Sequence, residues 1–545
     1  MGALLSHEKA ARTMGGRMDR LVIRGAAVLD GTGTPAVRGD VLVDDGRIEA
    51  LLPPGAPVAA ARVVDAGGLV VAPGFIDIHT HSDVSVLLDG RAQSKVHQGV
   101  TTEVVGNCGF SAFPLVSRHL GDHVELLAGI GDDPVSPDWR DFAGYAAALE
   151  GGGTAVNVAA LVGHGQLRIA ANGMDARLPP QRLAAMCALL SEQLEQGAFG
   201  LSTGLTYVPS RYADTAELTA LCRMLARHDR LYATHARGSS VDAIDEAGRL
   251  GRDTGARIQF SHLAINEPDR WGRAGELLTV IDRHRDDGVD LAADVYPYDA
   301  SASALTQYLP AWVHEGGVDA MRTRLADPSV LRRAEAELAA GWGDGGRIPW
   351  FWDRVILART DGVLDAPEGA TVLRAAEAAG VSEARYVLEL CRAGGNRVQV
   401  VLFYRTEDDM REFLRHPQTL VGSDGSALPY EQDGRRPHPR AFGAHARVLG
   451  RYVRELGDLE LATAIHSMTS AVADRLRITD RGVLRPGLAA DAVVFDPATI
   501  ADRATYLDPG RPPIGVTHVL VNGRLVIDDG AQTAERPGRV LRARR

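Results

Sequence analysis

The pattern of apolar and polar positions divides the chain into two end segments and a long middle segment. Residues 19–70 consist of short alternating runs broken by Gly and Pro: LVIRGAAVLDG, DVLVDDGRIEAL and RVVDAGG. Such runs are typical of strands joined by tight turns. The same pattern returns near the other end, in GLAADAVVFDP and THVLVNGRLVIDDG. We therefore expect residues 19–70 and 476–545, the latter with a tail, to form the two parts of one small β-sandwich domain.

Between the two ends, short apolar runs alternate with longer segments of helical character. The eight runs are VVAPGFIDIH, VTTEVVG, VNVAALVGH, FGLSTGL, RLYATH, RIQFSH, VDLAADVYPY and TLVGSD. Strands that alternate with helices form a parallel sheet, and eight such units close into a TIM-like (β/α)8 barrel. The sequence thus predicts an α/β fold with the barrel over residues 71–475.

One stretch of the predicted barrel is too long for an ordinary connection. It runs from residue 305 to about 415 and contains two further strand-like runs, RVILART and RVQVVLFY. A connection between a strand and a helix in a compact domain is usually only a few residues long. We interpret part of this stretch, about residues 305–365, as an inserted subdomain that precedes the last barrel strand.

Composition and charge narrow the classes of function and location. The formal net charge of -11 argues against binding to nucleic acid or to an anionic membrane, which use basic clusters. The four cysteines form no CxxC pair, and no run of about 18 apolar residues exists, so we expect a cytoplasmic protein without a transmembrane helix. Residues 1–18 lack the apolar centre of a secretory signal and are interpreted as an extension, disordered or upstream of the true start.

Reactive side chains recur where the predicted strands end, which is the edge that carries catalysis in barrel enzymes. They are His79, His81, Cys108, His235, His262 and Asp424. Alone, each has a plain explanation: an Asp before Gly is usually a turn residue, and a single Cys is often a small buried hydrophobe. Together, imidazoles, a thiol and a carboxylate at the ends of five strands form the ligand set of a zinc site. We expect His164, at the end of the third strand, either to hydrogen-bond to a ligand of such a site or to line the pocket.

Longer motifs around these residues carry a resemblance to a known family. They include PGFIDIHTHSD, GVTTEVVGNCGFS, GLSTGLTYVPSRYADTAEL, YATHARG, DVYPY, GSDG, HPRAFGAHARVLGRYVRE and RPGLAADAVVFDP. On these motifs the chain resembles the N-acyl-D-amino-acid deacylases (D-aminoacylases) of the amidohydrolase superfamily, over about residues 19–535. The motifs VVGNCGFS and STGLTY are the most specific to this branch. The resemblance implies zinc and a TIM-like barrel with a β-sandwich and an insertion before the last strand.

The resemblance also implies a role for each candidate ligand. Cys108, His235 and His262 would hold the principal zinc ion, while His79, His81 and Asp424, with Cys108 as a bridge, would frame a second, weakly occupied position. Zinc lowers the pKa of a bound water to about 7, so hydroxide forms near neutral pH. We expect Asp424 to act as the general base that takes the proton from this water. It then returns the proton to the leaving amine.

Other matched positions concern the substrate, a small N-acyl compound. Tyr207, Tyr296 and Arg440 match family positions that bind its α-carboxylate, and the planar guanidinium of arginine suits a carboxylate. The chain departs from the family at Ala264, because D-aminoacylases typically have a lysine two residues after the last imidazole ligand. The resemblance therefore implies weaker binding of simple N-acyl-D-amino acids and a preference for bulkier or differently charged amides.

Two alternatives remain open from the sequence. The first is a cyclic amidase of the hydantoinase or dihydroorotase kind, which would need a lysine at a strand end to be carboxylated as a metal bridge. Cys108 stands where that bridge is expected. The second is a non-catalytic metal-binding barrel, which the intact ligand set and Asp424 disfavour.

Overall fold

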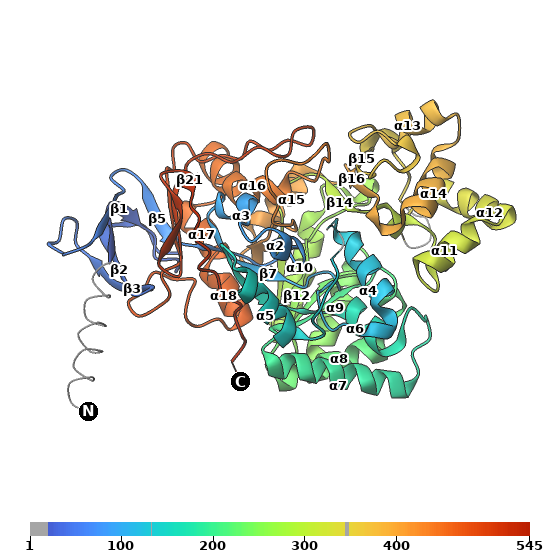
Figure 1. Ribbon diagram of the computed structural model, residues 1–545, viewed down its shortest axis with the longest axis horizontal. Helices are drawn as coiled ribbons and strands as arrows, with labels where there is room; N and C mark the ends of the chain where they lie inside the picture. Colours follow the sequence, from blue (N-terminus) through green and yellow to red (C-terminus); the bar gives the residue numbers. More distant parts are fainter. Residues whose placement is uncertain (1–19, 132, 134, 344–347, 545) are drawn as a thin grey trace.

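The computed structural model describes residues 20–131, 133, 135–343 and 348–544. The predicted extension over residues 1–18 lies outside the described residues. In Figure 1 a β domain built from both chain ends lies on the left, a barrel lies in the centre, and a helical subdomain projects at the upper right. This arrangement confirms the predicted fold class.

The barrel is a ring of parallel strands. In chain order they are β6 (Phe75–Asp77), β7 (Val100–Val105), β8 (Asn157–Ala160) with β9 (Val162–Gly163), β10 (Gly200–Gly204), β11 (Leu231–His235), β12 (Arg257–Phe260), β13 (Leu291–Val295) and β17 (Thr419–Val421). A bridge between Thr80 and Gly425 brings the first and last strands together. The strands are buried along their whole length, apart from His235 at the end of β11, as expected for a parallel sheet covered by helices.

Helices cover the outside of the barrel, and four of those named here begin at a capping side chain. They include α5 (Phe142–Gly152), α7 (Pro180–Gln196), α8 (Thr215–Arg227), α9 (Val241–Thr254), α10 (Ala274–Asp286) and α15 (Glu407–Arg415). The side chains of Asp141, Asp214, Ser240 and Thr406 accept hydrogen bonds from the first turns of α5, α8, α9 and α15. These caps satisfy N–H groups that have no partner within the helix. These caps fix where the four helices begin.

The two chain ends share one nine-stranded sheet. The N-terminal part contributes β1 (Leu21–Val28), β2 (Val37–Asp44), β3 (Arg47–Leu52), β4 (Arg62–Asp65) and β5 (Val70–Pro73), and the C-terminal part contributes β18 (Ala492–Phe495), β19 (Val516–Val521), β20 (Arg524–Asp528) and β21 (Ala531–Gln532). The two parts meet where β5 pairs antiparallel with β18. Residues beyond this sheet return to the barrel, where Val540 pairs with Val158 of β8.

The inserted subdomain has its own sheet and its own hydrophobic core. The sheet contains β14 (Ser301–Ala304), β16 (Gln399–Leu402) and β15 (Val355–Arg359), and the helices are α11 (Val318–Leu325), α12 (Pro328–Ala339), α13 (Val372–Ala379) and α14 (Glu383–Gly394). The core runs from Leu305 to Tyr404. Residue 365, where we ended the insertion on sequence, lies inside this unit, because β16 returns to pair with both β14 and β15. Among the described helices of the whole chain, none is long and apolar enough to cross a membrane.

Candidate metal centre

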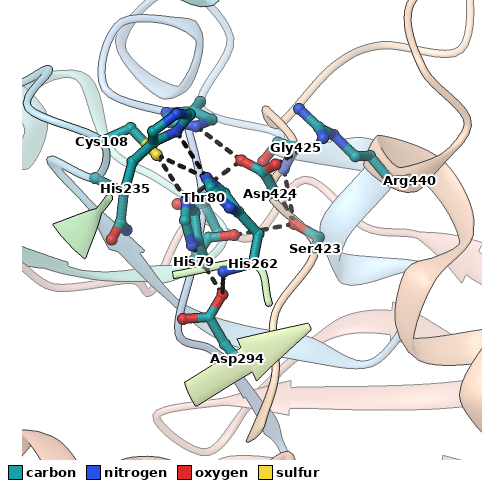
Figure 2. A network of polar contacts seen from close by, with 12 residues as sticks. His79, Thr80, Cys108, His235, His262, Asp294, Ser423, Asp424, Gly425 and Arg440 are labelled. Carbon is teal, nitrogen blue, oxygen red and sulfur yellow. Dashed lines mark hydrogen bonds and ion pairs between the residues drawn. The ribbon is translucent and has the colours of Figure 1, made fainter. Parts of the chain in front are cut away.

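The ligand candidates converge at the open face of the barrel. Figure 2 labels all of them except His81, which contacts Asp424. His79 and His81 follow β6, Cys108 follows β7, His235 ends β11, His262 follows β12 and Asp424 follows β17. Donor atoms of four of them, His79, Cys108, His262 and Asp424, lie within 4.8 Å of one another. Residues separated by up to 345 positions in the chain thus meet because parallel strands end at the same edge.

The distances between the donor atoms are those of a crowded ligand shell. The Cys108 Sγ lies 3.2 Å from His79 Nε2 and 3.5 Å from His262 Nε2. His262 Nε2 also lies 2.9 Å from His235 Nδ1. Asp424 Oδ1 lies 2.9 Å from His81 Nε2 and 3.3 Å from His79 Nε2. Nitrogen, sulfur and carboxylate oxygen atoms that face one another in this way fit a cation between them.

The backbone turns three of these residues toward the centre. Cys108, His262 and Asp424 have positive φ angles of 54°, 37° and 52°. Left-handed backbone at a residue other than glycine costs on the order of 1–3 kcal/mol and is concentrated at functional sites. In this conformation the donor atoms of the three residues point across the strand ends.

The protonation states of His235, His262 and Asp424 suit a metal such as zinc. Burial opposes protonation of His79, but Cys108 and Asp294 raise the pKa of His79 well above its usual range, so metal binding there must release a proton. Burial lowers the pKa of His262 to about 3, and burial together with His262 holds the pKa of His235 well below its usual range. Burial alone would raise the pKa of Asp424, but Arg440 and His79 hold it well below its usual range. Two ligands are therefore neutral imidazoles and one is a carboxylate, which are the forms that bind metals. Burial raises the pKa of the Cys108 thiol to about 11, although His79 opposes this, so metal binding here must release the thiol proton.

Two further residues orient the ligands, and sequence reasoning missed both. Asp294 on β13 accepts a hydrogen bond from the backbone N–H of His262 (2.8 Å) and faces His79 Nδ1 at 2.9 Å. Thr206 Oγ1 lies 2.8 Å from His235 Nε2. A partner on the second ring nitrogen directs the first nitrogen to the metal. For Asp294 a signal existed in the sequence, because an acidic residue inside the apolar run VDLAADVYPY needs a buried partner.

A buried lysine holds the loop that carries Asp424. The Lys95 Nζ, with no exposed surface, donates to Ser423 Oγ (2.7 Å), to the Gly425 carbonyl (2.8 Å) and to Asp77 (3.0 Å). The sequence contains only one other lysine, Lys9, which lies outside the described residues. Because Lys95 is engaged in these bonds, it is not available as a carboxylated bridge between metals. A cyclic amidase that uses a carboxylated lysine is therefore disfavoured.

The three predicted substrate residues line the cavity above the ligand cluster. The Arg440 Nη1 lies 2.6 Å from Asp424 Oδ2, and its guanidinium lies 4.7 Å from the centre of the Tyr296 ring. The Tyr207 ring packs against the ring of His235, with a centroid distance of 4.9 Å. Figure 2 shows Arg440 on the side of Asp424 that faces away from Cys108 and His235. A group bound by Arg440 therefore lies beside the ligand cluster.

His164 does not contact the ligand cluster. Its Nδ1 lies 2.9 Å from Ser210 Oγ, and its Nε2 lies 2.8 Å from Glu217 Oε1, within a buried network that includes Arg168. The Ser210 hydroxyl lies close to Gly109, the residue after Cys108. Through Ser210, His164 thus supports the loop that carries Cys108. It makes no direct hydrogen bond to a candidate ligand among the described residues.

The cavity has a volume of about 1290 Å³. Typical ligand pockets span about 300–1,000 Å³, so this cavity is large for a small N-acetyl amino acid. The inserted subdomain contributes apolar residues to its wall, namely Leu309, Pro310, Trp312, Trp342 and Ile348. The cavity thus joins the polar barrel mouth to an apolar surface of the insertion.

Known proteins match nearly the whole chain. A sequence profile of the amidohydrolase family matches residues 62–527. The N-acyl-D-glutamate deacylase of Alcaligenes xylosoxydans xylosoxydans is 39% identical, with 96% of each chain covered. The D-aminoacylase of the same organism is 36% identical, covering 96% of this chain and 97% of its own. A crystal structure of N-acyl-D-glutamate deacylase from Bordetella bronchiseptica, complexed with zinc and a phosphonate mimic of the tetrahedral intermediate, matches with a TM-score of 0.81 at 36% identity, covering 96% of this chain and 99% of that one.

Proposed function

The chain belongs to the amidohydrolase family, in the branch of the N-acyl-D-amino-acid deacylases, and from this we infer that it hydrolyses the amide bond of N-acyl-D-amino acids with zinc. The observation that carries the proposal is the convergence of His79, Cys108, His262 and Asp424 within 4.8 Å, beside Arg440. This arrangement places a metal ligand set next to a cation that suits a substrate carboxylate.

The donor set fits zinc. Cysteine sulfur and imidazole nitrogen are the ligands that zinc prefers in proteins, and Cys108, His235 and His262 supply them for one tight site. His79, His81 and Asp424 would hold a second, weaker position that shares Cys108. When bound, zinc polarises the amide carbonyl and makes water acidic enough to lose a proton near neutral pH.

Side chains of this protein transfer the proton, orient the metal ligands and position the substrate. The Asp424 carboxylate, ionised and held by Arg440 through Oδ2, takes the proton of the attacking water and returns it to the leaving amine nitrogen. Asp294 keeps His79 and His262 oriented toward the centre. Arg440 and Tyr296 bind the α-carboxylate and so fix the amide relative to Asp424.

The size of the cavity supports a substrate larger than an N-acetyl amino acid. A volume of about 1290 Å³ leaves most of the space empty around a small acyl group. The apolar wall of the insertion can bury a longer acyl chain or a bulky amino-acid side chain. We expect poor activity on small N-acetyl-D-amino acids and better activity as the acyl chain lengthens.

A substrate screen on the full chain tests the proposal. Metal is removed with a chelator and zinc is restored to at least one equivalent, and release of free amine is then measured with N-acetyl-, N-hexanoyl- and N-decanoyl-D-leucine. The three L-enantiomers serve as matched controls. We expect zinc-dependent release from the D-compounds. If the zinc-loaded protein releases no amine from any of them, the proposed function is wrong.

A further inference from the structure

Arg405 is a charged residue of the cavity wall that the proposed mechanism does not use. It follows β16, the strand by which the chain leaves the inserted subdomain, and its side chain is half-buried. Within the described part of the chain, no carboxylate forms an ion pair with it; its Nε donates instead to the Asn266 side-chain oxygen at 3.2 Å. A neutral amide leaves the positive charge uncompensated.

Neighbouring arginines of the same cavity differ in this respect. Three of them have carboxylate partners: Arg237 with Glu246 (3.2 Å), Arg270 with Glu276 (3.5 Å) and Arg359 with Asp133 (2.8 Å). A half-buried guanidinium is costly to leave unpaired, because its charge loses part of its hydration. Arg405 is therefore suited to bind an anionic ligand.

Tyr296 connects Arg405 to the reaction centre. The guanidinium groups of Arg405 and Arg440 each lie 4.7 Å from the centre of its ring. The Tyr296 hydroxyl is buried and makes no hydrogen bond of good geometry with the described residues. Two guanidinium groups and one unsatisfied hydroxyl around a single ring form a set of donors for one anion.

The position of Arg440 identifies which anion fits. Its guanidinium lies 2.6 Å from Asp424, the proposed base, so a carboxylate bound beside it must lie close to the scissile amide. In an N-acyl amino acid the α-carboxylate is separated from the amide nitrogen by a single carbon atom. A side-chain carboxylate is further away along a flexible chain.

We propose that Arg405 is a specificity-determining residue that binds the substrate's α-carboxylate together with Arg440 and Tyr296. The inference rests on the proposed function and adds to it a residue from the inserted subdomain. Arg405 donates to Asn266, which lies on the loop after His262, two residues beyond Ala264. His262, Ala264 and Asn266 all line the cavity. Arg405 thus places a positive charge beside this loop, where Ala264 itself carries no charge.

The test compares Arg405→Met with Arg270→Met, an ion-paired arginine of the same cavity. For the best N-acyl-D-leucine substrate, we expect Arg405→Met to raise KM by about 10- to 100-fold with little change in kcat, as expected for a lost charge-assisted hydrogen bond. The carboxamide analogue of that substrate should show no such change, because it lacks the anion. Arg270→Met should leave both parameters near wild type, and Ala264→Lys in the Arg405→Met background should recover part of the lost affinity.

A second measurement separates this inference from the proposed function. Calorimetric titration with D-leucine, a product that carries the carboxylate, reports binding without turnover, and its Kd should rise by a similar factor in Arg405→Met. Hydrolysis with an unchanged KM and Kd in this variant would overturn the role of Arg405 and leave the proposed function intact. Weakening confined to N-acyl-D-glutamate, with N-acyl-D-leucine unaffected, would also overturn it, because Arg405 would then bind a side-chain carboxylate.

Discussion

The two ends of the barrel strands are built on opposite principles. At the open end, donor atoms of His79, Cys108 and Asp424 lie close together in an arrangement that fits a cation. At the other end, which we call the floor, the buried Asp491 carboxylate accepts from Arg481, from the Asn522 backbone (2.6 Å) and from the Asn157 side chain (3.1 Å). At the floor each charged group faces its opposite, whereas at the mouth several metal-binding donor atoms face one another. The comparison teaches that function and stability are assigned to different ends of the same strands.

The largest expected effect concerns the Cys108 thiol at the mouth. Cys108→Ala should lose bound metal, and its activity should fall by more than about 10⁴-fold, beyond the usual contribution of a general base. Metal content by plasma mass spectrometry and amine release measure the two effects. Cys187→Ala removes a thiol from α7 far from the cluster and should keep both. A Cys108→Ala protein with full metal content would show that the thiol is not a ligand.

The next effect separates chemistry from metal binding. Asp424→Asn should lower kcat by about 10²–10⁴-fold, because the amide cannot take a proton from water. The variant should still fold, because the amide keeps the shape of the carboxylate, but its melting temperature should fall, since the buried Arg440 guanidinium loses its charged partner. Asp282→Asn, on the surface of α10, is the matched control and should keep wild-type turnover. Turnover close to wild type in Asp424→Asn would exclude this residue as the base.

At the floor the expected effect is on stability alone. Asp491→Ala leaves the buried Arg481 guanidinium without its main partner, which should cost about 3–5 kcal/mol of unfolding free energy. Asp480→Ala removes the other, half-exposed partner of the same arginine and should cost less than about 1 kcal/mol. Urea unfolding and kcat/KM are measured together. A drop in kcat/KM per folded molecule for Asp491→Ala would contradict the division between floor and mouth.

The smallest expected effect lies on the outer helices and depends on pH. Hydrogen bonds from Arg451 and Tyr452 lower the pKa of Glu407 to about 2, although partial burial opposes this. A lowered pKa contributes stability that is fully present above pH 4.5, the ordinary pKa of the group, and is lost as the pH falls toward about 2. Glu407→Gln should therefore remove about 1 kcal/mol at pH 7, since the pair is partly solvated, and little at pH 2. An equal loss of stability at both pH values would mean that the charge of Glu407 does not contribute. Glu412→Gln, exposed on the same helix, is the control.

The fold was largely predictable because each barrel strand is a short apolar run with a clear end. The boundaries of the insertion were not, since β15 and β16 have the same buried, β-branched character as barrel strands. Only the antiparallel pairing of β16 with β14 on one side and β15 on the other distinguishes them. Local pattern does not encode that pairing.

The candidate site shows the same limit. His79, Cys108 and Asp424 could be proposed as ligands because their residue types and strand-end positions are visible in the sequence. Arg405 could not, because its place in the cavity depends on where the chain returns to the barrel after β16 and on contact with Asn266, 139 positions away. The structure brings the candidate ligands together, while their occupancy by metal stays a prediction.

The sheet shared by both chain ends has a consequence for synthesis of the protein. Val70 of β5 pairs with Phe495 of β18, so one edge of the N-terminal sheet lacks its partner until 425 more residues (495 minus 70) have been made. At about 5–20 residues per second, the ribosome needs roughly 20–85 s for this stretch. During that time the strand edge of β5 is exposed and can pair with other nascent chains. Yield of folded protein should therefore depend on chaperones and on growth temperature more than on the strength of the finished core.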